Sequence, residues 1–187
     1  MITTVLKNIA YQFYPKNICS TANFDKYLKS SEYIKLKILL DSFHNESNNI
    51  FNEFTNEFNP KYNFDNQSRL QQLDRCFTFN LSVVKDGELH SIVILISVIS
   101  PYYTIRNIKH KTINYFLSEL EKKELEKKFS EITIKNLILE IEHILDNKFK
   151  YNKFPDELKL KIIENINFQD SHLNHFTMFN AFFNNTI

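Results

Sequence analysis

The stretch that decides the fold is residues 76–100, CFTFNLSVVKDGELHSIVILISVIS. Residues 76–83 alternate polar with apolar side chains, which is typical of a strand with one buried face. The Asp86-Gly87 pair then separates two segments rich in strand-forming residues, which is the strongest short-range signal for a β-hairpin. Residues 92–99 are almost wholly apolar, so we expect the second strand to lie centrally and to be covered on both faces. Residues 102–108 are expected to add a further strand or an edge.

Before the hairpin, apolar side chains recur at three- and four-residue intervals, as they do in amphipathic helices. Residues 23–43 predict one such helix. Residues 49–58 predict a second, separate helix, which Pro60 ends because proline cannot continue the backbone hydrogen bonding.

After the hairpin, a helical pattern begins with Ile113 and Phe116 and continues into the strongly charged segment 119–128. The mixed signs of that segment are typical of a solvated helix face with supporting ion pairs. A second apolar stripe over residues 134–145 is out of phase with the preceding apolar residues. We therefore predict two helices with a break at residues 130–133.

Both ends of the chain carry apolar segments. Residues 5–14 suit a short strand or an ordered N-terminal arm, and residues 156–165 suit either a short helix or a strand. Residues 176–183 are too apolar for a free tail and should pack on the core. Together these patterns predict a single globular domain over 1–187 of the α+β class, with a small antiparallel sheet around a central hairpin, packed by several amphipathic helices.

Composition narrows the setting in which the chain works. Of its 187 residues, 43% are apolar and 24% charged, as in an ordinary folded protein. No secretory signal is visible, the longest apolar stretch is too short to span a membrane, and Cys19 and Cys76 suit two free thiols in a reducing compartment. The net charge of +1 provides no field for nucleic acid or an anionic membrane. We expect a cytoplasmic protein that has neither of those partners.

Gly87 is the only glycine in the chain. Phosphate-binding loops, dinucleotide fingerprints and nucleophile elbows all need several glycines, because their backbones take positive φ values or approach a ligand closely. Those three kinds of site are therefore excluded. Enzymes whose sites use side chains alone are not excluded by this argument.

The residues that could carry chemistry do not assemble into a recognisable site. His172 and His175 have the spacing of two metal ligands on a helix, but no Cys pair or further His completes a zinc pattern. Cys76 follows Arg75, whose charge would favour a thiolate, yet a small buried cysteine in a strand is common. We predict no catalytic residue, no metal and no cofactor.

Residues 41–66 carry five acidic residues and one lysine, with phenylalanines between them. Such a segment offers both the charge and the aromatic anchors of a protein-binding surface. The alternative is that the phenylalanines, at helical spacing, belong to the core. Tyr102 and Tyr103 could likewise be an exposed aromatic pair or the end of a strand. The candidate partner-binding residues are Glu46, Phe51, Glu53, Phe54, Glu57, Tyr102 and Tyr103.

The chain ends with Phe176-Thr177-Met178-Phe179-Asn180-Ala181-Phe182-Phe183. Together with Pro155-Asp156-Glu157-Leu158 and Asn167-Phe168-Gln169-Asp170, this ending resembles small bacterial immunity proteins that neutralise antibacterial toxins, including type VI effectors, although it lacks the glycine often found before it. The resemblance implies a cytosolic protein without a cofactor that occludes the active surface of one cognate toxin. A small enzyme with side-chain-only chemistry and a structural subunit of a larger assembly are the other hypotheses.

Overall fold

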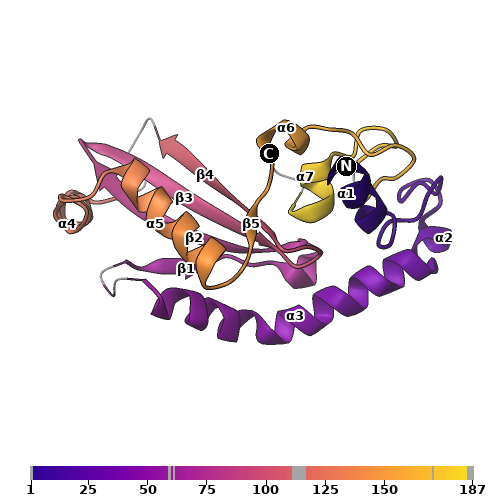
Figure 1. The fold of residues 1–187 in the computed structure, drawn as a ribbon, viewed down its shortest axis with the longest axis horizontal. Helices are drawn as coiled ribbons and strands as arrows, with labels where there is room; N and C mark the ends of the chain where they lie inside the picture. The colour runs from indigo at the N-terminus through magenta and orange to yellow at the C-terminus, as the bar shows by residue number, and fades with distance from the viewer. Residues whose placement is uncertain (1, 59, 61, 111–116, 170, 185–187) are drawn as a thin grey trace.

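A computed structural model describes residues 2–58, 60, 62–110, 117–169 and 171–184. Figure 1 shows an elongated molecule with the sheet at one end, a group of short helices at the other, and the long helix α3 running beside both. One contiguous set of buried apolar side chains extends from Leu6 to Phe183. The elements are α1 (Ile2–Ala10), α2 (Phe24–Leu28), α3 (Ser31–Asn56), β1 (Phe64–Asn66), η1 (Leu70–Gln72), β2 (Cys76–Lys85), β3 (Glu88–Ser97), β4 (Tyr102–His110), α4 (Glu119–Lys128), α5 (Ile134–Asn147), β5 (Asn152–Lys153), α6 (Asp156–Lys159) and α7 (Met178–Phe182).

The α+β class is confirmed, with the predicted hairpin at the centre of the sheet. The strand order is β1-β2-β3-β4-β5, antiparallel from β1 to β4, while the two-residue β5 pairs with β4 in parallel. Asp86 and Gly87 form the hairpin turn with φ values of 51° and 74°. Two successive positive φ values match the right-handed twist of the flanking strands, which explains why the one glycine stands there. Strand β3 is central, and residues 94–98 are buried on both faces.

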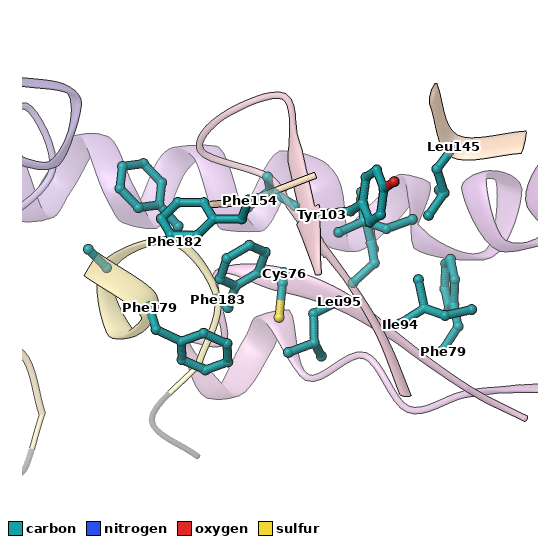
Figure 2. Close-up of a cluster of buried hydrophobic side chains, with 14 of the residues drawn as sticks. Cys76, Phe79, Ile94, Leu95, Tyr103, Leu145, Phe154, Phe179, Phe182 and Phe183 are labelled. Carbon is teal, nitrogen blue, oxygen red and sulfur yellow. The ribbon is translucent and has the colours of Figure 1, made fainter. Parts of the chain in front are cut away.

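The helices α3 and α5 pack on the same face of the sheet. Phe43 and Phe51 of α3 contact Phe77 and Phe79 of β2, with ring centroids 5.9 and 5.2 Å apart. Leu145 of α5 lies near Tyr103, whose side chain is on that face (Figure 2). The predicted helix over residues 134–145 is thus present, and Thr133 caps it after the predicted break. Segment 119–128 is also helical, with Ser118 as its cap, whereas Ile113 and Phe116 lie outside the described residues.

The two helices predicted over residues 23–43 and 49–58 are divided differently in the structure. Ser30 has an extended backbone and accepts a hydrogen bond from the Tyr33 N–H, so it ends the short α2 segment and caps α3. From Ser31 the helix continues without a break to Asn56. The asparagine-rich residues 45–49 have low helix propensity, but the buried side chains before and after them hold the helix on the sheet, and tertiary packing overrides propensity.

Of the two alternatives for residues 5–14, a short strand or an ordered N-terminal arm, the strand is wrong, because residues 2–10 form the helix α1 with Leu6 and Ala10 buried one turn apart. Residues 156–165 combine the two alternatives: α6 is a single helical turn, and Ile162 then forms an isolated bridge with Thr177. The C-terminal segment packs on the core as predicted. Figure 2 shows Phe182 and Phe183 beside Phe154, with ring centroids 5.9 and 5.4 Å from it.

Arg75 joins the sheet to the C-terminal elements. Its side chain is fully buried, and its guanidinium donates to Asn180 O and to Leu73 O, the latter at 2.8 Å. The group also lies over the ring of Phe168, 5.0 Å from the centroid. A cation in the interior needs such partners, because a buried unpaired charge is very costly. The two ends of the molecule are therefore connected by a polar contact as well as by apolar packing.

Candidate functional site

Helix α3 is the longest helix in the described part of the chain, and its outer face is open to solvent. Leu36, Leu40 and Phe54 mark the buried side of this helix. On the opposite side Ile34 and Ile38, one helical turn apart, are 46% and 65% exposed. Two large aliphatic side chains exposed next to each other form a small apolar patch, whereas scattered ones are ordinary.

The exposed charged residues of α3 differ between its N-terminal and C-terminal halves. Lys35 and Lys37 are exposed beside the isoleucines in the N-terminal half. Glu46 and Glu53 are exposed in the C-terminal half, where the last turn contains no basic residue. A partner with a basic surface would meet the acidic half of the helix favourably.

The structure separates the predicted acidic residues from the predicted aromatic ones. Phe54 is 1% exposed and contacts the ring of Phe79 at 4.9 Å, and Phe51 is half-buried against the same ring. Phe54 is therefore a core residue and Phe51 packs against the core, which favours the alternative that the phenylalanines of this segment belong to the core. Glu46 and Glu53 are open to solvent, while Glu57, also exposed, forms an ion pair with Lys148 of the loop after α5.

The tyrosine pair does not form an exposed aromatic surface. Tyr102 is half-buried, edge-on to Phe154 at 5.6 Å, and Tyr103 is 1% exposed. Burial, followed by a hydrogen bond with the Asp146 carboxylate, raises the pKa of the Tyr103 hydroxyl. Because successive residues of a strand point to opposite faces, the two rings cannot act as one surface. Tyr103 is thus a core residue that links β4 to α5.

Ile34 and Ile38 were not among the predicted site residues. The signal was present in the sequence: within residues 23–43 they fall opposite Leu36 and Leu40 on a 3.6-residue period. The sequence shows that the two pairs lie on opposite sides of the helix. Only the packing of α3 on the sheet shows which of the two sides is exposed.

The two cysteines are both free thiols, as expected, but differ in environment. Burial raises the pKa of the Cys76 thiol to about 12, and the guanidinium of Arg75 is directed to backbone carbonyls instead. Cys19 lies at the surface, where hydrogen bonds with the Thr21 hydroxyl and then with the backbone of Ala22 and Thr21 lower its pKa to about 7. Hydrogen bonds to the charged form favour the thiolate, so Cys19 is the more reactive of the two.

A cavity of about 330 Å³ opens at the N-terminal end of α3, and its lining includes Ser20 and Thr21, which follow Cys19 in the chain. Its walls are mostly aromatic or aliphatic, with a few polar groups, which suits an apolar side chain or small ligand. His172 and His175, the other candidate ligands, have ring centroids 6.3 Å apart, and the described residues contain no group of three His, Cys, Asp or Glu that could hold a metal. The cavity is lined by Ser20, Thr21, Phe24, Tyr27, Leu28, Tyr33, Leu73, Phe168 and Gln169.

No helix in the described part of the chain is both long enough and apolar enough to cross a membrane. Comparison of the chain with protein-family models, with curated proteins and with solved structures gives no significant match.

Proposed function

We propose that this chain is a cytoplasmic immunity protein that binds and neutralises a cognate antibacterial toxin, and that the outer face of α3 makes the contact. The observation that carries the proposal is the solvent side of this one helix, which exposes the pair Ile34 and Ile38 in its N-terminal half and the acids Glu46 and Glu53 in its C-terminal half. It places an apolar pair beside lysines and on the same helix as exposed acids, and protein interfaces likewise combine apolar with charged residues.

The packing beneath α3 supports the same role. Phe43, Phe51 and Phe54 fix one side of the helix to the sheet. A helix held in this way presents its outer side chains without paying a large ordering cost when a partner binds. Because Glu46 and Glu53 lie on this rigid surface, the acidic half can meet a basic active surface of a toxin and speed the encounter.

The test is co-expression of the tagged chain with the product of the neighbouring open reading frame. We expect the neighbouring product to be toxic alone, harmless in the presence of this chain, and co-purified with it. The double variant Glu46→Lys/Glu53→Lys should bind at least about tenfold more weakly, mainly through slower association. Ile38→Asp should weaken binding through a faster dissociation.

The matched control is Glu124→Lys/Glu157→Lys, which makes the same change in net charge at two exposed residues outside α3. This control should protect cells as the wild type does. A neighbouring product that is harmless, or remains toxic in the presence of this chain, would reject the immunity function. Protection and affinity that are unchanged in both α3 variants would reject the α3 surface alone.

A further inference from the structure

The outer edge of β4 is open over most of its length. Only its first two residues, Tyr102 and Tyr103, pair with β5. Along residues 104–110 the described part of the chain places no strand and no backbone hydrogen bond at this edge. At about 3.3 Å per residue, the open edge is roughly 20 Å long.

The short pairing with β5 shows which backbone groups face outward. Asn152 N–H donates to Pro101 O at 2.9 Å, and Phe154 N–H donates to Tyr103 O at 2.8 Å. Since backbone groups along a strand alternate between its two sides, the outward groups beyond Tyr103 belong to Ile105, Asn107 and Lys109. The intervening residues direct their backbone groups to β3.

The far half of β4 is exposed on both faces as well as at its edge. Asn107, Ile108 and Lys109 are consecutive and all exposed, although successive side chains point to opposite faces. Figure 1 shows β4 at the edge of the sheet that lies away from α3. An extended segment could therefore reach it while α3 is occupied.

We propose that the edge of β4 over residues 104–110 binds an extended segment of a partner protein, which adds to the sheet as an antiparallel strand. Main-chain hydrogen bonds give such a complex its affinity, and the side chains opposite give it specificity. This contact is a second interaction surface, separate from the outer face of α3.

The side chains of β4 specify the chemistry of that segment. The strand contains Arg106 and Lys109 and no acidic residue, and an isoleucine, Ile105 or Ile108, stands directly before each of them. Opposite charges directly across a strand pair are favourable and like charges are not. The segment that fits places an acidic residue opposite each basic one and an aliphatic residue opposite each isoleucine, giving the order acidic, aliphatic, any residue, acidic, aliphatic.

A second copy of the chain fits this edge less well, because two basic strands would then meet. Lys109 does pair with Glu88 at 2.6 Å, but the two side chains are 55% and 44% exposed. An ion pair this open to solvent is weak, so the ammonium group of Lys109 can exchange Glu88 for an acidic residue of a partner strand. The charge of β4 therefore favours an acidic partner strand over β4 of a second copy of the chain.

The first test uses the ¹⁵N-labelled full chain and the capped peptide Thr-Glu-Val-Thr-Glu-Val-Thr. We expect saturable shifts of the outward amides of Ile105, Asn107 and Lys109, with much smaller shifts at the inward amides of Thr104 and Ile108. The same peptide with lysine in place of glutamate should bind at least about tenfold more weakly. No saturable shift at the three outward amides, or equal binding of both peptides, overturns the proposal.

The second test removes one outward donor. Asn107→Pro deletes the outward N–H and leaves the hydrogen bonds to β3, which is how proline is tolerated in edge strands. Asn107→Thr keeps the N–H and, like the proline variant, loses the side-chain contact with His90 Nδ1, which is 3.0 Å long. Peptide binding should fall at least about tenfold in the proline variant only. Equal binding of the two variants contradicts the proposal.

Light scattering on the chain alone tests whether a second copy of the chain binds this edge instead. A wild-type dimer that Asn107→Pro converts to monomer would assign the edge to a second copy and overturn the proposal. If the proline variant fails to fold, the amide shifts of the wild type still decide the question. Since no toxin enters these measurements, their outcome is independent of the immunity function.

Discussion

The fully buried guanidinium of Arg75 gives the sharpest stability prediction, for the substitution Arg75→Met. Methionine approximates the length of the side chain and avoids a large cavity, so the change acts mainly through the lost hydrogen bonds. The carbonyls of Leu73 and Asn180 would each lose a charged donor. An orphaned buried polar group costs about 1–3 kcal/mol, so two of them cost about 2–6 kcal/mol. We expect the free energy of unfolding to fall by about 3–5 kcal/mol, the middle of this range, because the carbonyls left behind are buried and neutral.

The assay is urea unfolding followed by far-UV circular dichroism, because the chain contains no tryptophan. With a slope of about 2 kcal/mol per molar urea, the midpoint should drop by about 2 M. The exposed Arg69 provides a matched control, since Arg69→Met removes the same charge at the surface and should change stability by less than about 0.5 kcal/mol. A loss below about 1 kcal/mol in Arg75→Met, with an unchanged slope, would refute the reasoning that this group clamps the C-terminal elements to the sheet.

Two further predictions concern residues whose roles the structure separates. Phe54→Ala should lower the free energy of unfolding by about 3–5 kcal/mol in the same urea assay, because the ring is 1% exposed among other aromatic rings; a surface role would give a loss below about 1 kcal/mol. Iodoacetamide should alkylate Cys19 of the folded chain with a pH midpoint near 7, because the thiolate is the reactive form and predominates above that pH. The buried Cys76 should react only after unfolding. Peptide mass spectrometry at several pH values measures both thiols, and a Cys19 midpoint near 9 would show that the hydrogen bonds from Thr21 and Ala22 do not stabilise its thiolate.

The candidate surface was only partly accessible from the sequence. Glu46 and Glu53 were predicted as surface residues from charge, and they are exposed. Phe51 and Phe54 were grouped with them because they are neighbours along the chain, yet on a helix such neighbours point in different directions. Which side chains of α3 face the sheet depends on how the helix is rotated about its axis. Contacts with β2, which is distant in sequence, fix that rotation.

The sequence by itself determined the hairpin, because a two-residue turn with positive φ values is encoded by its own residues, Asp86 and Gly87. It also determined the break before α5, since Thr133 caps that helix locally. Only the tertiary structure decided that α3 is continuous through its asparagines, that Ile34 and Ile38 face solvent, and that the edge of β4 stays open. Turns and caps depend on bonds between near neighbours, whereas burial and exposure depend on which distant segments arrive to cover a surface.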